Sequence, residues 1–472
     1  VVEPVAVGIA EVIGPRDPVV DGLTPGARLR RMPVMQETNI SRRRFLGTSA
    51  AVAGPLILPS GSLFGRKVSP NQKLNIGVIG AGGKGTVDTD GCATENIVAL
   101  CDVDARTLEA RKARYPKAKV YRDYRVMLEE IGDSLDAVTV STPDHHHFPA
   151  SMLAMKMGLH VYVQKPLAHS VWEAREMLKT ARKHKVITQM GNQGHSYDST
   201  RKVVEYVRGG VLGEVKEVHV WTDRPIWPQG MGRPTGSTPV PDYLDWDLWL
   251  GPAPERPHAA GYHPFKWRGF WDFGTGALGD MGCHNMDAAF WALELGAPTS
   301  VQAESSGINP ETAPKWSVIR YEFPARGKKP PVTLTWHDGG KRPSADLIGE
   351  KQLPKNGSLI IGSKGTIAFK EWNPNGFRLL PEENFKNFDE PAPSLPRVGG
   401  NPYQEWIKAC KGGSPCLAHF DYSVPLTEMV LLGNLALRVG DKIEWDSENL
   451  KAKNNPKADQ FIRTEVRKGW EV

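Results

Sequence analysis

The 472-residue sequence has no long hydrophobic run and only five cysteines. No stretch reaches the roughly 20 consecutive apolar residues that a membrane-spanning helix needs, so we expect no transmembrane segment. The cysteines are too few and too scattered for a disulfide scaffold or a paired-cysteine metal site. Free thiols are the ordinary interpretation, and a bridge between Cys410 and Cys416 stays open.

Excess charge is also scarce outside the N-terminus. The net charge is +6, but residues 1–72 hold nine Lys or Arg against five Asp or Glu, so they contribute +4. The rest of the chain therefore carries only +2. Because nucleic-acid binding requires a concentrated basic face, we expect no nucleic-acid partner.

The N-terminal extension holds a candidate export signal. Residues 41–46 read Ser-Arg-Arg-Arg-Phe-Leu, and a short, weakly apolar run rich in Gly and Ala follows them. The segment 41–60 resembles a twin-arginine signal, although a basic start of an amphipathic helix is the alternative. A natural start at Met35 would place the arginines near the N-terminus. We interpret residues 1–72 as a leader or non-native extension that carries this signal. We therefore expect a bacterial protein that the twin-arginine route exports to the periplasm.

A glycine run follows the first β-rich segment. Residues 73–80 lead directly into Gly-Ala-Gly-Gly-Lys-Gly, which fits G-x-G-x-x-G after a strand. Gly80 would turn sharply, Gly82 would let the backbone approach a pyrophosphate, and Gly85 would let helix and strand pack closely. The run predicts a dinucleotide site.

An acidic residue supports this interpretation. Asp102 ends the next apolar strand, about 20 residues past the first glycine, where the residue that binds the adenosine ribose is expected. A carboxylate there would repel a 2′-phosphate, which favours NAD. Arg106 lies close by in the sequence, so NADP is not excluded.

Strand and helix patterns alternate between residues 73 and 193, and then change. The alternation predicts an α/β Rossmann domain with a doubly wound parallel sheet, its site at the carboxyl ends of the strands. For residues 194–472 we expect an α+β domain with a largely antiparallel sheet and C-terminal helices that pack back on the first domain. The expected strands cover 97–101, 136–140, 160–163, 186–190, 215–221, 299–305, 316–323, 332–336, 357–362 and 366–369, and the expected helices cover 106–114, 150–157, 171–183 and 200–208.

Four further segments carry a family resemblance. They are Ser-Thr-Pro-Asp-His-His-His at 141–147, Gln-Lys-Pro at 164–166, Gly-Asp-Met-Gly-Cys-His at 279–284 and Asp-Tyr-Ser-Val-Pro-Leu at 421–426. Together with the glycine run, they resemble the Gfo/Idh/MocA oxidoreductase family from about residue 73 to the C-terminus.

The resemblance implies a catalytic set of Lys165, Asp280 and His284. Removal of a hydride from an alcohol carbon requires the hydroxyl proton to leave too, and an imidazole can accept it near neutral pH. His284 is the implied base, and Lys165 is the implied hydrogen-bonding partner or relay. Asp280 lies four residues before His284 and so on the same helix face. A helix-surface ion pair is the structural alternative.

The resemblance also implies further cofactor contacts at Thr142, Pro143 and His147. Gln164 stands where the family usually has Glu, although an amide can still hydrogen-bond a ribose hydroxyl. The histidines at 145–147 suggest a metal site, but consecutive residues point in different directions and no matching ligand cluster accompanies them. We therefore predict no metal.

Aromatic residues are concentrated near the start of the second domain. Six of the 14 tryptophans fall between residues 221 and 271. Indole rings stack on the C–H faces of sugars, while polar groups bind their hydroxyls, although packing in the core is the alternative. The residues that we select for substrate contact are Tyr262, His263, Trp267 and Arg268.

These features predict an NAD-dependent oxidoreductase, with NADP not excluded, that acts on a sugar or polyol. Export of a folded protein would require a tightly bound cofactor that is regenerated in place. An NAD-dependent glycoside hydrolase that oxidises, eliminates, adds water and reduces is the alternative, and a non-catalytic sugar sensor is a third. The resemblance further implies a homo-oligomer.

Overall fold

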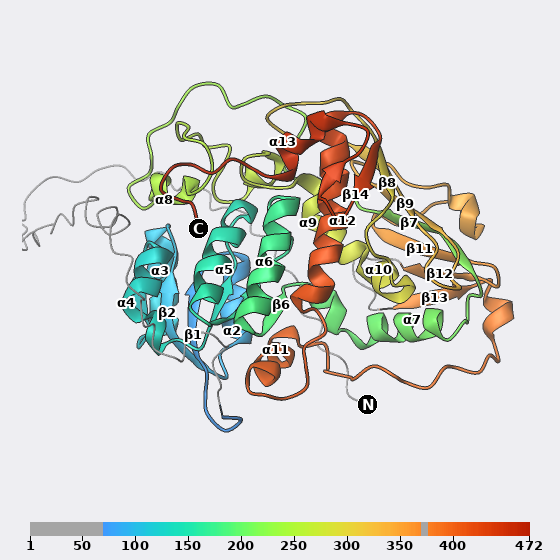
Figure 1. Cartoon of the computed structure of the whole chain (residues 1–472), viewed down its shortest axis with the longest axis horizontal. Helices are drawn as coiled ribbons and strands as arrows, with labels where there is room; N and C mark the ends of the chain where they lie inside the picture. Colours follow the sequence, from blue (N-terminus) through green and yellow to red (C-terminus); the bar gives the residue numbers. More distant parts are fainter. Residues whose placement is uncertain (1–68, 370–375) are drawn as a thin grey trace, which may run out of the picture. The chain divides into compact units, whose positions relative to one another are not determined.

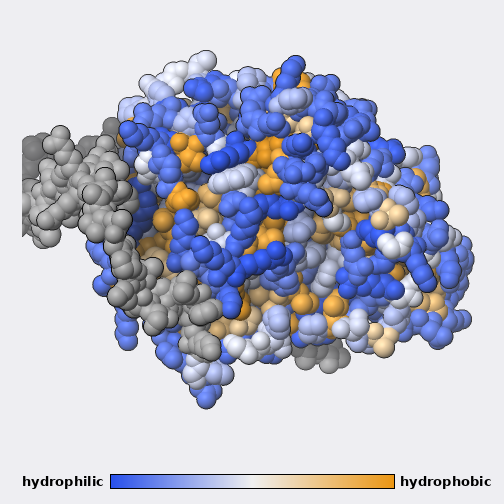
Figure 2. Space-filling model, in the orientation of Figure 1, coloured by the Kyte–Doolittle hydropathy of each residue, from blue (hydrophilic) through white to orange (hydrophobic). Residues whose placement is uncertain are grey.

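A computed structural model describes residues 69–369 and 376–472. The twin-arginine segment 41–60 lies outside the described residues, so export stays a prediction. Within the described ranges, no helix is both long and apolar enough to cross a bilayer. Hydrophilic residues dominate the face drawn in Figure 2, and hydrophobic residues form small scattered patches there.

The first sheet of the described chain has six parallel strands in the order β3-β2-β1-β4-β5-β6. The prediction of a doubly wound parallel sheet is confirmed. β4 and β5 are buried at every residue, as strands covered by helices on both faces must be. The strands are β1 (Asn75–Ile79), β2 (Asn96–Cys101), β3 (Lys119–Tyr121), β4 (Ala137–Val140), β5 (His160–Val163) and β6 (Thr188–Met190), and the helices are α2 (Lys84–Gly91), α3 (Ala105–Arg114), α4 (Tyr124–Ile131), α5 (His147–Lys156) and α6 (Val171–His184).

The strand order reverses direction between β1 and β4. In open α/β sheets, ligands bind in the crevice outside the carboxyl ends of the strands at such a switch point. The loops that follow β1, β4 and β5 therefore meet at one edge of the sheet. The glycine run and the 141–147 segment begin in the first two of these loops and continue into the helices that follow, and the 164–166 segment lies in the third.

The second sheet contains nine strands of the described chain, in the order β13-β12-β11-β7-β10-β9-β8-β14-β15. The expected antiparallel character holds except between β7 and β10, which run parallel with Leu334 opposite Val218. The strands are β7 (Val215–Trp221), β8 (Ser300–Ser305), β9 (Ser317–Phe323), β10 (Val332–His337), β11 (Gly357–Gly362), β12 (Thr366–Phe369), β13 (Phe377–Leu380), β14 (Ile443–Asp446) and β15 (Lys451–Ala452).

The helix α12 (Phe420–Val439) lies between α6 of the first half and the strand β8 of the second sheet (Figure 1). α12 packs against α6 of the first sheet, and there Arg175 forms an ion pair of 2.5 Å with the buried Glu428. The helices are α7 (Asp198–Arg208), α8 (Trp246–Leu250), α9 (Gly276–Asn285), α10 (Asp287–Leu293), α11 (Pro402–Cys410), α12 (Phe420–Val439) and α13 (Asp459–Ile462). Short 3-10 turns lie at Gly132–Ser134, Asp144–His146, Gln193–Ser196, Lys266–Gly269, Ala345–Ile348, Glu382–Phe385 and Pro456–Ala458.

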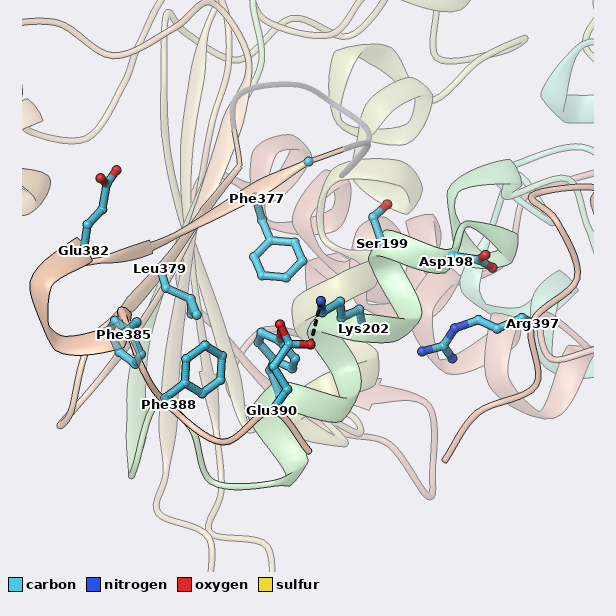
Figure 3. A pocket seen from close by; sticks show the side chains of 12 residues that line it. Asp198, Ser199, Lys202, Phe377, Leu379, Glu382, Phe385, Phe388, Glu390 and Arg397 are labelled. Carbon is cyan, nitrogen blue, oxygen red and sulfur yellow. Dashed lines mark ion pairs between the residues drawn. The ribbon is translucent and has the colours of Figure 1, made fainter. Parts of the chain in front are cut away.

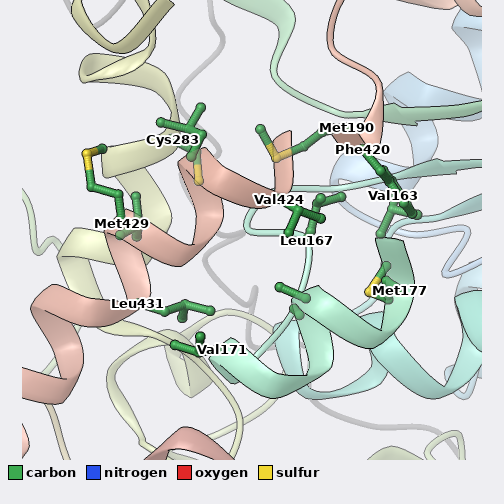
Figure 4. Packing of buried hydrophobic residues seen from close by; sticks show 14 of the residues in the cluster. Val163, Leu167, Val171, Met177, Met190, Cys283, Phe420, Val424, Met429 and Leu431 are labelled. Atoms are coloured by element: carbon green, nitrogen blue, oxygen red, sulfur yellow. The ribbon is translucent and has the colours of Figure 1, made fainter. Parts of the chain in front are cut away.

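One hydrophobic core joins the two halves. Figure 4 shows Val163 and Met177 of the first sheet and its helices in the same cluster as Val424 and Met429 of α12. Cys283 of α9 belongs to this cluster and is 0% exposed. All five cysteines lie in the described ranges and are buried and free, so the bridge between Cys410 and Cys416 does not form. This core fixes α9 against the carboxyl edge of the parallel sheet.

Candidate active site

The glycine loop has the tight geometry that its sequence predicts. Gly80 directly follows β1 and has a φ of 80°, and a Cβ atom there would lie 2.7 Å from the backbone of Ser141. A Cβ atom on Gly85 would lie 1.8 Å from the carbonyl oxygen of Gly80. No L side chain fits either position without a backbone shift. The loop therefore brings the start of α2 close to β1, and the N-terminus of a helix is suited to bind an anion.

Asp102 at the end of β2 lies against this loop. Its Oδ2 accepts hydrogen bonds from the backbone N–H groups of Ala81 at 2.9 Å and Gly82 at 3.0 Å. Its Oδ1 accepts one from the N–H of Asp104. Burial raises the pKa of Asp102, although these backbone donors oppose the rise. The carboxylate thus lies beside Gly82, in reach of a ligand bound over the loop.

The ends of β4 and β5 supply the next group of predicted cofactor residues. Thr142 and Pro143 follow β4, and the buried Thr142 Oγ1 has no hydrogen-bond partner among the described residues. His147 lies with Nδ1 2.7 Å from the carbonyl oxygen of Pro166 and Nε2 2.9 Å from that of Thr142. Both ring nitrogens face backbone carbonyls, so this imidazole braces two loops against each other.

The neighbouring histidines have a similar structural role. His145 contacts the carbonyl oxygens of Phe273 and Trp249, each at 3.1 Å. His146 contacts the carbonyl oxygen of Trp249 at 3.0 Å. Burial lowers the pKa of both residues, which keeps them neutral. They attach the 249–273 region to the parallel sheet, and the described part of the chain holds no cluster of three or more potential metal ligands.

Lys165, Asp280 and Arg268 meet at the carboxyl edge of the sheet. Lys165 Nζ, from the loop after β5, donates to Asp280 Oδ1 at 3.0 Å and to the Asp280 carbonyl oxygen at 2.5 Å. Arg268 Nε donates to the same Oδ1 at 3.2 Å. The side chains of Lys165 and Asp280 are 14% and 16% exposed. Burial alone would raise the pKa of Asp280, but the two cations outweigh it and hold that pKa at about 2.

His284 lies one helical turn after Asp280 on α9. Its Nδ1 is 2.9 Å from Oδ1 of Asn192, in the loop after β6. An amide oxygen accepts, so this contact assigns the proton to Nδ1 and leaves the lone pair on Nε2. Burial and the charge of Lys165 lower the pKa of His284 to about 3, against the opposing effect of Asp280. The imidazole is therefore neutral at pH 7.

The predicted substrate residues divide into two groups. Tyr262 and Trp267 are 1% and 6% exposed and pack in a cluster with Trp249 and Phe273, which favours the packing alternative for both rings. Arg268 reaches the Lys165–Asp280 pair. His263 is partly exposed, and its Nε2 lies 4.0 Å from Asp104 Oδ2, beside the loop that carries Asp102.

Two residues that contact the predicted set were absent from the sequence prediction. Asn192 orients His284, and its own Nδ2 is buried without a partner among the described residues. Asp88 on α2 accepts a hydrogen bond of 2.7 Å from Gln164 Nε2. Asn192 follows a predicted strand end, which is a usable signal for a site residue. Asp88 lies inside a helix and offers no such signal.

An open groove of about 580 Å³ lies elsewhere, between α7 and β13. Figure 3 shows Phe377 and Phe388 among its lining side chains. Lys202 and Glu390 face each other there in an ion pair of 2.7 Å. None of the predicted site residues lines this groove, so it forms no part of the candidate active site.

Comparison with curated proteins finds sugar-acting enzymes. The chain is 30% identical to D-glucoside 3-dehydrogenase of Escherichia coli over 240 residues, which is 50% of this chain and 58% of that protein. It is 34% identical to a glycosyl hydrolase family 109 protein of Solibacter usitatus over 171 residues, 33% of this chain and 38% of that protein. It is 30% identical to an alpha-N-acetylgalactosaminidase of Shewanella oneidensis over 207 residues, 38% of this chain and 44% of that protein. The matches thus span less than two thirds of each relative.

Solved structures share the fold. The WlbA dehydrogenase of Bordetella pertussis, solved with NADH and UDP-GlcNAcA, has a TM-score of 0.56 and 18% identity, covering 79% of this chain and 99% of that chain. The aldose-aldose oxidoreductase of Caulobacter crescentus, solved with glycerol, has a TM-score of 0.56 and 18% identity, covering 79% of this chain and all of that chain.

Family models match almost the whole described chain. The model for the oxidoreductase family, NAD-binding Rossmann fold, matches residues 74–192. The model for the oxidoreductase family, C-terminal alpha/beta domain, matches residues 201–472, which is more than half of the chain. The chain belongs to the Gfo/Idh/MocA oxidoreductase family.

Proposed function

We propose that the chain is an NAD-dependent oxidoreductase that oxidises a hydroxyl-bearing carbon of a sugar or polyol. The observation that carries this proposal is the convergence of Lys165, Asp280 and His284 at the carboxyl edge of the parallel sheet. A neutral imidazole, a lysine and a carboxylate in one partly exposed cluster are suited to remove a hydroxyl proton while a hydride leaves the same carbon.

NAD fits the residues around the cluster. Gly80 and Gly85 allow the tight turn from β1 into α2, whose N-terminus can bind a pyrophosphate, and the Asp102 carboxylate beside Gly82 could accept a hydrogen bond from a ribose hydroxyl. The unpaired Thr142 Oγ1 provides a further polar contact. Bound NAD would supply the hydride acceptor. The Asp102 carboxylate favours NAD over NADP through charge repulsion.

His284 would accept the substrate hydroxyl proton at Nε2. The Asn192 amide oxygen accepts from the opposite nitrogen, which selects the tautomer that takes up a proton at Nε2. Lys165, held by Asp280, would donate a hydrogen bond to the substrate oxygen and stabilise its developing negative charge. Once His284 carries the proton, the Asp280 carboxylate stabilises the resulting imidazolium electrostatically.

The cellular setting forms part of the proposal. The twin-arginine segment 41–60 would export the folded chain to the periplasm with its cofactor already bound. A retained cofactor must be reset in place, which requires a second substrate or a reaction that returns the hydride. We further predict that the chain forms a homo-oligomer.

An NAD-dependent glycoside hydrolase is the second candidate. The relatives named as glycosyl hydrolase family 109 proteins and as an alpha-N-acetylgalactosaminidase favour it. Oxidation of a ring hydroxyl would acidify the adjacent C–H, so the glycosidic group could be eliminated. Addition of water and return of the hydride would complete the reaction. The same Lys165, Asp280 and His284 would perform its first step.

Turnover assays with NAD and a panel of free sugars, polyols and aryl glycosides test both candidates. The dehydrogenase predicts NADH formation that is lost in Lys165→Ala and His284→Ala. The glycosidase predicts aglycone release without net NADH. If the native chain binds NAD but neither activity occurs, the oxidoreductase proposal fails. The remaining hypothesis is then a non-catalytic, cofactor-binding sensor.

A further inference from the structure

Asp88 on α2 is a fully buried carboxylate, with 0% of its surface exposed. Its Oδ1 accepts hydrogen bonds from Lys84 Nζ and from Tyr403 Oη, both at 2.8 Å. Its Oδ2 accepts hydrogen bonds from Ser141 Oγ and Gln164 Nε2, both at 2.7 Å. A carboxylate offers about four lone-pair positions, so these described side chains satisfy the buried charge in full.

The four donors come from separate parts of the fold. Ser141 directly precedes Thr142 at the end of β4, and Gln164 directly precedes Lys165 at the end of β5. Lys84 begins α2, and Tyr403 comes from α11 in the second half of the chain. Asp88 therefore links the helix of the glycine loop to both strand ends that carry predicted cofactor residues.

Asp88 also determines how Gln164 presents its amide. Because a carboxylate can only accept, the amide nitrogen must face Asp88, and Oε1 is then the acceptor on the other side of the amide. The amide lies against Gly191, where a Cβ atom would be 2.5 Å from Nε2. A carboxylate at position 164 would place two like charges at hydrogen-bonding distance, which is strongly unfavourable.

We propose that Asp88 is a positioning residue of the cofactor site, and that it acts through Gln164. It carries the negative charge of the pair and holds the Gln164 amide in the orientation that offers a neutral acceptor to a ribose hydroxyl. Gly191 supplies the space that lets Gln164 reach Asp88. This inference rests on the proposed binding of NAD.

Calorimetric titration with NAD tests this role, after any retained nucleotide has been removed from the full-length chain. Each of Asp88→Asn and Gln164→Glu should weaken NAD binding about tenfold or more, because each removes a charge-assisted hydrogen bond. The double variant Asp88→Asn/Gln164→Glu puts the amide on α2 and the carboxylate at the end of β5. One amide-to-carboxylate hydrogen bond can then form again, so affinity should return to within about threefold of the native value.

Asp90→Asn is the matched control on the same helix. Asp90 pairs with Arg111 at 2.5 Å and contacts neither Asp88 nor Gln164. This variant should bind NAD like the native chain, which separates a specific effect from a general loss of an acidic side chain on α2. Thermal melting of each apoprotein verifies that the variant is folded.

Gly191→Ala tests the same contact without a change of charge. The added methyl group should displace the Gln164 amide and weaken NAD binding about fivefold or more. If the native chain does not bind NAD, the proposed function fails. If it binds NAD, but the double variant is as weak as the single variants or Gly191→Ala binds as the native chain does, the positioning role of Asp88 is wrong.

Discussion

His284 gives a prediction that requires no substrate. Burial holds its pKa at about 3 in the folded chain, against an ordinary value of 6.5. As the pH falls below 6.5, His284 takes up a proton in the unfolded chain but not in the folded chain. The free energy of unfolding therefore decreases progressively between pH 6.5 and about pH 3. At about pH 5 the loss is about 2 kcal/mol, since one pKa unit corresponds to about 1.4 kcal/mol.

Urea unfolding of the native chain and His284→Gln measures this difference. Glutamine does not titrate, so between about pH 8 and about pH 5 the native chain should lose about 2 kcal/mol more unfolding free energy than the variant. The other buried histidines are present in both chains, and their contributions cancel. His184→Gln, at the partly exposed end of α6, is the control and should show a much smaller difference. Equal pH dependence in the native chain and His284→Gln would refute a neutral His284 with a lowered pKa.

Three further substitutions test the loop and the core. Gly85→Ala would place a Cβ atom 1.8 Å from the Gly80 carbonyl oxygen. We expect this variant to lose about 1–3 kcal/mol of unfolding free energy and to lose NAD binding. An unchanged calorimetric affinity for NAD would contradict the close approach of the two glycines. Asp102→Ala removes two hydrogen bonds to the loop and a predicted ribose ligand, so NAD affinity should fall about tenfold. Equal NAD affinity in both chains would argue against the ribose assignment. Arg201→Met leaves the buried Glu405 without its ion-pair partner, which lies at 2.8 Å. The free energy of unfolding should fall by about 3–5 kcal/mol. An unchanged melting curve would show that the pair adds no stability.

Much of the parallel sheet could be predicted because its signals are local. Short apolar strands alternate with amphipathic helices, and most observed boundaries differ from the expected ones by only a few residues. β3 and α4 were missed, although Tyr124, Met127, Leu128 and Ile131 of α4 have helical spacing and are buried. The parallel pairing of β7 and β10 depends on tertiary contacts, and no local pattern carries it.

The candidate site was less accessible to sequence reasoning. Lys165 and Asp280 are 115 positions apart in the sequence. Only the family resemblance, and no spacing between them, predicted that they share a site. The concentration of aromatic residues could not distinguish packing from sugar binding, and Tyr262 proved to be buried. Asn192 and Asp88 contact His284 and Gln164 through hydrogen bonds that form only when segments distant in the sequence meet.

The nucleotide content of the protein tests the central claim most directly. The chain would be purified from its native host and denatured, and any released nucleotide would be identified and quantified by mass spectrometry. We expect close to one NAD per chain, which would support both the dinucleotide site and the retention of the cofactor during export. A chain that releases no nucleotide, and that shows no calorimetric binding of added NAD or NADP, would contradict the proposed function.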